Sequence, residues 1–397
     1  MNPSILAAAL AGLLLCATDA TAGDFDAWPT HHTFADGTDL SASLNFAYDL
    51  NDFSGDRGYG TATTTLHDDD GMRRREFGAA LKKKGVYDAT VGMDFETNTW
   101  LDVALRVETK ALFGQDMGRI RVGYFKTPVG FESNSASRAG SLMENAAASQ
   151  AVFEGRRTGV EWSLARPDYA FSAAYFFGHD LQGDNPGTTA AARAFWLPLH
   201  GDARVLHLGV AASVENPHGN TDGRSIYTAP GARFRARPQA GLTDVRLVDS
   251  GKLMHVDRID RAGLEALWID GPWSLQGEYL IGSAQRDDGL RDFTAQGGYV
   301  TGSWLLTGES RPYSGGNVAN VKPAKGFGAV ELLARYGDLD LNDAGIAGGR
   351  QRDITFGANW YLTSHFKFQA NYVHVLDEKR AAYSATDEVE LRAQVQF

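Results

Sequence analysis

The sequence predicts an all-β fold, an antiparallel transmembrane β-barrel of about sixteen strands. The last ten residues, 388–397, alternate strictly between polar and apolar side chains, which is the period of a strand with one polar and one apolar face. About sixteen segments of this kind follow one another along the chain. The connectors between them are alternately short and long, and outer-membrane barrels likewise have tight turns on one side and long loops on the other.

The amino terminus predicts export. Residues 5–15 form an apolar stretch of signal-peptide length, too short to cross a membrane as a helix, although no Lys or Arg precedes it. A cleavage site of small residues ends at Ala22, so we expect a signal peptide over residues 1–22 and the barrel over residues 23–397. Cys16 leaves a lipid anchor as the alternative, although the residue before it is bulkier than most lipidation signals allow.

Composition agrees with a barrel but does not prove one. The chain after the signal peptide contains no cysteine, which excludes disulfides, and no apolar run long enough for a membrane helix. The formal net charge of −11 would also suit a soluble enzyme. In a barrel the apolar side chains occupy alternate positions, so a negative mean hydropathy is compatible with membrane insertion.

The predicted strands carry apolar side chains at alternate positions, with small or polar residues between them. Aromatic residues often lie at the segment ends, as an interfacial girdle requires. The clearest outward faces comprise Leu101, Val103, Leu105, Val107, Ile120, Val122, Tyr124, Tyr169, Phe171, Ala173, Tyr175, Phe177, Leu206, Leu208, Val210, Ala212, Val214, Ile354, Phe356, Ala358, Trp360, Leu362, Phe366, Phe368, Ala370 and Tyr372.

The connectors give the expected orientation. An even strand count places both termini in the periplasm, and sixteen to eighteen strands leave a water-filled lumen. One connector, residues 307–325, is long although it lies on the short-turn side. The predicted short turns include residues 84–86, 166–168, 270–272 and 363–365, and the predicted long loops are 51–71, 127–155, 179–188, 215–258, 285–290, 337–350 and 376–387.

A row of arginines in the long loop 215–258 indicates an anion pathway. Arg233, Arg235 and Arg237 repeat at every second position, so in extended backbone all three guanidinium groups point the same way. Such a row repels itself and is useful mainly where anions bind or pass, because guanidinium is always charged and its donors fit oxyanions. The alternative is a solvated loop face neutralised by lipopolysaccharide or by neighbouring carboxylates.

The chain also resembles the phosphate-selective porin O and P family of Gram-negative outer membranes. The order and spacing of several segments carry the resemblance over most of the mature chain. These segments are residues 72–74 (MRR), 122–132 (VGYFKTPVGFE), 142–144 (LME), 157–159 (RTG), the arginine row ending at Pro238, 302–313 (GSWLLTGESRPY), 332–336 (LLARY), 339–343 (LDLND), 359–361 (NWY) and 371–373 (NYV).

The resemblance implies a homotrimer of sixteen-stranded barrels, an anion porin with the third loop, residues 127–155, folded into each lumen. It also implies that anions pass arginines near the entrance and lysines near the exit. By position, Arg233, Arg235 and Arg237 match the ladder, Arg73 and Arg74 the paired arginines of the second strand, Lys82, Lys83 and Lys84 the exit cluster, Asp102 the constriction carboxylate, and Ser137 a hydroxyl of the third loop.

Three departures from the family pattern concern cations. Where phosphate-selective members have a lysine after the loop glutamate, this chain has Ser133, and where they have arginines it has Asn145 and Ser43. Fewer cations at the constriction predict a shallower anion well. We therefore expect an outer-membrane diffusion channel for small anions whose preference is broader than phosphate or polyphosphate alone.

The alternatives are an outer-membrane barrel enzyme and a non-conducting structural or adhesin barrel. A barrel lipase needs a serine beside a histidine on the outer face, and His374 has no matching serine nearby. We expect no enzyme activity, no cofactor and no metal site, since His31 and His32 lack further ligands. Asp68, Asp69 and Asp70 could bind calcium or bridge lipopolysaccharide, but read more simply as a solvated acidic turn. The expected partners are small anions, outer-membrane lipid and lipopolysaccharide.

Overall fold

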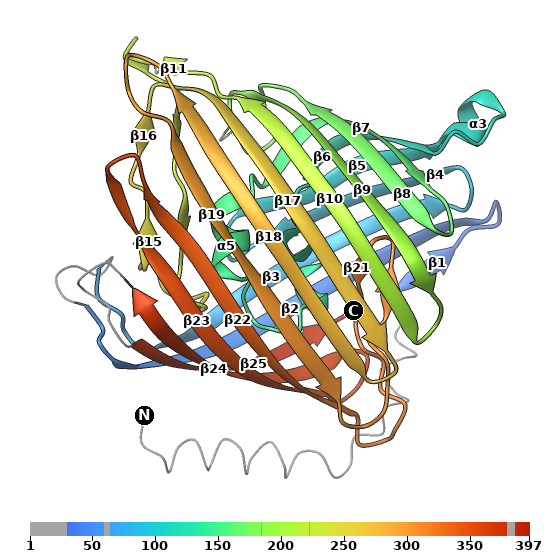
Figure 1. Cartoon of the computed structure of the whole chain (residues 1–397). Helices are drawn as coiled ribbons and strands as arrows, with labels where there is room; N and C mark the ends of the chain where they lie inside the picture. The colour runs from blue at the N-terminus through green and yellow to red at the C-terminus, as the bar shows by residue number, and fades with distance from the viewer. Residues whose placement is uncertain (1–29, 59–63, 184, 222, 379–385) are drawn as a thin grey trace.

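The computed structural model describes residues 30–58, 64–183, 185–221, 223–378 and 386–397. Within them, sixteen antiparallel strands form one tilted sheet that closes on itself when β25 pairs with β2 (Figure 1). The short β1 adds a seventeenth strand beside β2. The predicted barrel is therefore confirmed. The predicted signal peptide lies outside the described residues, as do parts of the predicted loops 51–71 and 376–387.

The barrel strands run from the amino to the carboxyl terminus, each beside the next. In the described residues four short helices lie in the connectors, β1 precedes the first barrel strand, and the other short strands pair two by two inside the connectors. The barrel strands are β2 (Thr38–Gly55), β3 (Asp69–Lys83), β4 (Tyr87–Asp94), β5 (Thr99–Glu108), β6 (Arg119–Lys126), β7 (Arg156–Ala165), β8 (Tyr169–Phe176), β9 (Thr188–His200), β10 (Arg204–Asn216), β17 (Val256–Asp270), β18 (Trp273–Arg286), β19 (Phe293–Leu305), β22 (Ala329–Asp343), β23 (Ile346–Tyr361), β24 (Phe366–Glu378) and β25 (Thr386–Gln396). The smaller elements are β1 (His31–Thr33), α3 (Thr109–Phe113), α4 (Phe131–Asn134), η2 (Ser137–Ala139), α5 (Ala147–Val152), β11 (Asn220–Thr221), β12 (Tyr227–Thr228), β13 (Gly231–Ala232), β14 (Arg235–Ala236), β15 (Val248–Asp249), β16 (Leu253–Met254), β20 (Tyr313–Ser314) and β21 (Asn317–Val318).

The sheet has polar side chains on its inner face and apolar side chains on its outer face, the reverse of a soluble protein. In β25 the polar residues Glu388, Glu390, Arg392 and Gln394 are buried inside the barrel, and the alternate residues point outward and are more exposed. Elsewhere the outer surface carries exposed apolar side chains, among them Val122, Trp196, Val210, Leu264, Trp273, Val300, Trp304 and Phe356. Trp273 and Trp304 stack at 4.8 Å near the turn side. None of the described helices is long and apolar enough to cross a membrane.

One predicted long loop is wrong. The segment 337–350 is not a loop, because β22 and β23 continue through it and are joined only by residues 344–345. At this end the pattern is reversed: Leu339 and Leu341 point inward and are fully buried, and Asp338 forms a 2.5 Å ion pair with Arg350 on the neighbouring strand. The alternation of polar and apolar residues did not reveal the strands here, because their inward positions are apolar where a loop packs on the inner wall.

The third loop, residues 127–155, crosses the lumen. It connects β6 to β7, yet its backbone carbonyls accept hydrogen bonds from the opposite wall, from Arg335, Asn359, Lys367 and Arg392. Its helix α5 packs against β18, β19 and β22 and lies within the barrel outline (Figure 1). The third loop is therefore folded into the lumen, as the family resemblance implies.

Two more connectors fill the lumen. The fifth loop, residues 217–255, packs Phe234, Ala236, Val248 and Leu253 against the inner wall of β17, β18, β19 and β22. On the opposite side, the unusual turn segment 306–328 contains the hairpin β20–β21 and contacts α4 of the third loop. The lumen is therefore narrowed from both ends.

Candidate functional site

A chain of three cavities surrounds the third loop. A cavity of about 310 Å³ lies among Arg73, Arg237 and the third loop. A second of about 600 Å³ lies between that loop and the wall from β2 to β7, and shares Arg74 and Asn145 with the first. A third of about 740 Å³ lies against segment 306–328 and shares Arg138 with the second. The shared residues show that the three cavities adjoin one another along the third loop.

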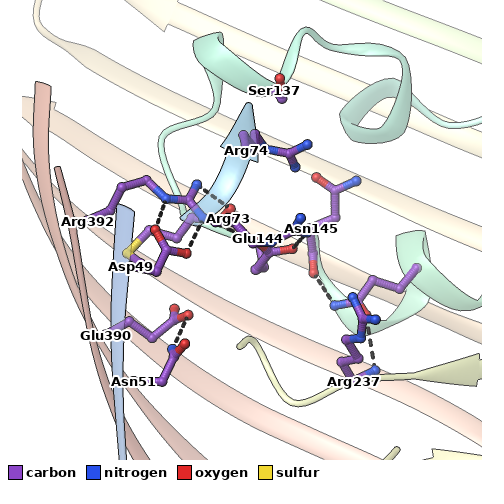
Figure 2. Close-up of polar contacts among 12 residues, drawn as sticks. Asp49, Asn51, Arg73, Arg74, Ser137, Glu144, Asn145, Arg237, Glu390 and Arg392 are labelled. Atoms are coloured by element: carbon purple, nitrogen blue, oxygen red, sulfur yellow. Dashed lines mark hydrogen bonds and ion pairs between the residues drawn. The ribbon is translucent and has the colours of Figure 1, made fainter. Parts of the chain in front are cut away.

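Arg73 and Arg392 hold the third loop in place from the barrel wall. Arg73 binds both oxygens of Glu144 at 2.8 and 3.0 Å, and Arg392 binds both oxygens of Asp49 at 2.6 Å (Figure 2). Arg392 also donates to the carbonyl of Met143 at 3.0 Å. Burial of Glu144 opposes its ionisation, but the charge and hydrogen bonds of Arg73 outweigh burial and lower its pKa to about 2.

A β-bulge turns both paired arginines of β3 toward the lumen. Neighbouring strand residues normally face opposite sides, but the register shifts between Ala47 and Tyr48, opposite the pair. Arg73 then reaches the third loop, and Arg74 forms a 3.0 Å ion pair with Glu76. The sequence predicted this pair through its family match, and it did not predict that both arginines have carboxylate partners.

The three arginines of the ladder lie on one face, as their spacing predicted. Arg233 and Arg235 are exposed and Arg237 is half-buried, whereas Phe234 and Ala236 between them are buried against the wall. Only Arg235 lies in a regular strand, so the alternation is maintained by packing of the intervening apolar residues and not by a long ladder of backbone hydrogen bonds.

Carboxylates neutralise two of the three ladder arginines. Arg233 binds Asp249 through two contacts of 2.9 and 2.5 Å, and Arg237 lies 3.2 Å from Asp244. Arg235 has no carboxylate partner among the described residues. The two interpretations of the sequence, an anion pathway and a loop face neutralised by carboxylates, therefore each describe part of the ladder.

The ladder is nevertheless a positive region. Burial, and then the charges of Arg237 and Arg235, lower the pKa of Arg246 to about 10. A guanidinium loses basicity in this way when other cations lie close to it. Arg235 and Arg237 therefore lie close to a fourth arginine of the same loop, Arg246.

Two buried lysines bind the third loop without any carboxylate. The Nζ of Lys126 donates to the carbonyls of Ser133 and Ser135 at 2.6 and 2.8 Å. From the far wall, the Nζ of Lys367 donates to the carbonyls of Arg138 and Gly140, both at 3.1 Å. Carbonyl oxygens carry only partial charge, so neither lysine is neutralised by a carboxylate in the described residues.

Sequence reasoning did not select these lysines. Lys126 stands within the family segment 122–132, and Lys367 occupies a polar position of an alternating strand, so each was visible only as a lumen-facing cation. Arg138 of the third loop is a third such cation. It is exposed, it lines two of the cavities, and its guanidinium has no partner in the described part of the chain.

Asp102, Ser137 and the three departures line the second cavity. Asp102 accepts a hydrogen bond from Arg156 at 2.8 Å, and the hydroxyl of Ser137 donates to Glu76 at 3.1 Å. Ser43, Ser133 and Asn145 line the same cavity, and the buried hydroxyl of Ser133 has no hydrogen-bond partner in the described residues. The structure thus brings the predicted constriction residues together.

The three lysines of the predicted exit cluster do not lie on one face. Lys83 pairs with Asp36 at 3.1 Å. Lys82 is an even number of residues from Arg74 and Glu76, so it lies on the same lumen-facing side of the strand. Strand alternation places Lys83 on the opposite face. Lys84 lies in the turn after the strand. Consecutive residues of a strand without a bulge point to opposite faces, which the family match by itself did not consider.

The remaining lumen charges form wall networks. Arg335 pairs with Glu132 of the third loop at 3.0 Å, and Arg311 pairs with Glu331 at 2.5 Å. Burial raises the pKa of Glu132, against the charge of Arg335. In the described residues no three His, Cys, Asp or Glu side chains gather to hold a metal ion.

Comparisons with known proteins agree on one family. A model of the family described as phosphate-selective porin O and P matches residues 40–397. An uncharacterised protein of Caulobacter vibrioides is 28% identical over 317 residues, 76% of this chain and 62% of the relative. Porin O of Pseudomonas aeruginosa is 26% identical over 299 residues, 66% of this chain and 65% of the relative. The chain thus spans less than two thirds of either curated relative.

Among solved structures, an in-vitro folded OmpT, an outer membrane protein of Vibrio cholerae, has a similar fold. The TM-score is 0.57 at 10% sequence identity, and the match covers 91% of this chain and 98% of that chain. A structure of the same protein described as a trimer form has a TM-score of 0.54 at 11% identity, over 91% of this chain and 99% of that chain.

Proposed function

The chain belongs to the phosphate-selective porin O and P family, a β-barrel of the outer membrane, and we propose that it is a diffusion channel for small anions. The observation that carries the proposal is a group of lumen cations that have no carboxylate partner in the described residues, among them Lys126, Lys367, Arg138 and Arg235. Lys126 and Arg138 line the cavity of about 600 Å³, Arg235 lies on the fifth loop, and Lys367 binds the third loop from the far wall. Positive charge along a narrow lumen raises the local anion concentration.

Planar bilayers test this proposal. The purified protein should give single-channel conductance, and a salt gradient should give a reversal potential of the anion-selective sign. Absence of conductance from correctly folded protein would favour a structural barrel. Conductance with a cation-selective reversal potential would contradict the assigned role of the arginines and lysines.

We place the anion contacts in the cavity of about 600 Å³ beside the third loop. Lys126 and Arg138 supply positive charge there, and the hydroxyl of Ser133 is a buried donor without a partner. Arg74 and Arg156 also line it but are held by Glu76 and Asp102. An anion meets few free charged donors, so small anions should pass without tight binding.

Phosphate selectivity is accordingly weak in this proposal. A doubly charged oxyanion needs several converging donors to form a saturable well. The positions of Ser133 and Asn145, cationic in phosphate-selective relatives, are neutral here. Phosphate should therefore reduce chloride current only at millimolar concentration or above.

The assembly and processing of the chain belong to the same proposal. We expect a homotrimer, an arrangement supported by the trimer form described for the similar OmpT structure. Chemical cross-linking in detergent, followed by mass measurement, tests it. We also expect removal of residues 1–22, which the amino-terminal sequence of the membrane-extracted protein would establish. Lipopolysaccharide remains an expected partner, and a conducting role leaves no need for enzyme activity.

A further inference from the structure

One wall of the cavity of about 600 Å³ consists of small side chains. A Cβ atom on Gly78 would lie 2.6 Å from the Oγ of Ser43, so glycine at this position leaves room for that hydroxyl. Cavities of about 300–1,000 Å³ usually take whole organic ligands, so this one has room for more than a single phosphate. Two neighbouring rows of cross-strand partners on β2, β3 and β4 make up the wall: Ser41, Ala80 and Thr90, and Ser43, Gly78 and Gly92.

This wall offers hydroxyl groups that the protein itself does not use. The three wall hydroxyls, of Ser41, Ser43 and Thr90, are half-buried and have no hydrogen-bond partner in the described residues. Their oxygens keep access to the cavity. The amide of Asn145 on the third loop is likewise without a partner in this part of the chain, and in Figure 2 it points toward Arg74. Each of these four groups can both donate and accept a hydrogen bond.

One unpaired guanidinium shares the cavity with these hydroxyls. Three arginines and two carboxylates line it, and Arg74 and Arg156 are each held by one of the carboxylates, at 3.0 and 2.8 Å. The third arginine, Arg138 of the third loop, is exposed and has no partner in the described part of the chain. The Nζ of Lys126 is committed to two carbonyls of the same loop. The guanidinium charges therefore exceed the carboxylate charges by one, which balances a singly charged anion.

We propose that this cavity takes polyhydroxylated organic anions with a single negative charge, of the sugar-acid type. The acid group of the ligand lies at Arg138, and its hydroxyl groups form hydrogen bonds with the three wall hydroxyls and with Asn145. The inference rests on the proposed function, since it names the substrate class of the same lumen. It also gives two departures from the family pattern a role. Ser43 and Asn145 can donate and accept, as binding a hydroxyl requires, whereas the arginines of the relatives can only donate.

Block of the chloride current in planar bilayers by three probes of similar length tests the inference. Gluconate carries one carboxylate and a row of hydroxyl groups. Hexanoate has the same number of carbons and the same charge without the hydroxyls, and sorbitol has the hydroxyls without the charge. We expect gluconate to reach half-block at a concentration about tenfold or more below that of hexanoate or sorbitol, and below that of phosphate.

Variants separate the hydroxyls from the charge. Ser43→Ala/Thr90→Val removes two wall hydroxyls and no charge, so gluconate should lose most of its advantage over hexanoate in the same channel. Arg138→Gln should weaken gluconate block toward that of sorbitol. The matched control is Ser172→Ala, which removes a lumen-facing hydroxyl of β8 outside this cavity and should keep the gluconate block of the wild type. Saturation-transfer NMR with gluconate and the detergent-solubilised protein measures binding without any current.

Equal block by gluconate and hexanoate in a wild-type channel that is anion-selective would overturn the inference and leave the proposed function standing. A gluconate preference that survives in Ser43→Ala/Thr90→Val would also overturn it, because the wall hydroxyls would then not be its cause. Gluconate transfer in NMR that is lost in this variant, from a protein that gives no current, would support the binding site and contradict the proposed function. Neither transfer nor current in the wild type would contradict both.

Discussion

Removing the charge of Arg235 should change selectivity more than removing a complete ion pair of the same ladder. Arg235→Ala deletes a charge that has no carboxylate partner in the described residues. The matched control, Arg237→Ala with Asp244→Ala, deletes a pair 3.2 Å apart and leaves the net charge unchanged. Asp244 has an 80% exposed side chain, so its loss should not disturb packing.

The magnitude follows from Coulomb's law. An anion passing about 8 Å from a guanidinium gains roughly 0.5 kcal/mol in water. Screening at about 0.1 M salt, with a Debye length of about 10 Å, leaves roughly 0.2 kcal/mol. Attraction of anions and equal repulsion of cations then predict that Arg235→Ala lowers the ratio of anion to cation permeability about twofold. At about 1 M salt the Debye length is about 3 Å, and the change should fall below about 15%.

Reversal potentials across a tenfold salt gradient measure this ratio in planar bilayers, in one dilute and one concentrated series. The control pair variant should differ from the wild type by less than Arg235→Ala in the dilute series. Identical reversal potentials for Arg235→Ala and the wild type in dilute salt would refute the reasoning and make the ladder an inert loop face. A shift of equal size in concentrated salt would also refute it, because a screened charge cannot act there.

Three further outcomes are expected. Ser133→Lys with Asn145→Arg should deepen phosphate block of the chloride current by tenfold or more, and half-block of the unmodified channel at micromolar phosphate would contradict the neutral constriction. The pKa of Glu144 is lowered to about 2, so its contact with Arg73 contributes full stability above the unfolded pKa of about 4.3 and loses it as the pH falls toward about 2. The third loop should therefore stay in place, and the single-channel current should stay steady, from pH 7 to about pH 4, and the current should become noisy below about pH 3. The current of Glu144→Gln should be noisy at every pH. Arg392→Met leaves Asp49 buried without its cation, so the free energy of unfolding should fall by about 3–5 kcal/mol in denaturant titrations of the barrel, and a loss below about 1 kcal/mol would show that water replaces the arginine.

The sequence determined the barrel because strand alternation is a local property. Each side chain faces either lipid or lumen according to its parity, and residues 388–397 show this without knowledge of any other part of the chain. Parity also determined that Arg233, Arg235 and Arg237 share a face. Parity failed as a guide over 337–350. There the fifth loop packs on the inner wall, so the inward positions are apolar and the outward positions are polar.

Only the tertiary structure decided which charges are free. Arg73 and Arg74 are alike in the sequence as lumen cations, but Arg73 is occupied by Glu144, 71 residues away on the third loop, whereas the partner of Arg74 is Glu76 on its own strand. Lys126 and Lys367, from opposite walls, have no carboxylate partner in the described residues, because the third loop offers them only carbonyls. The sequence determines where a charge points through the period of the strand, whereas its neutralisation depends on which distant loop folds against it.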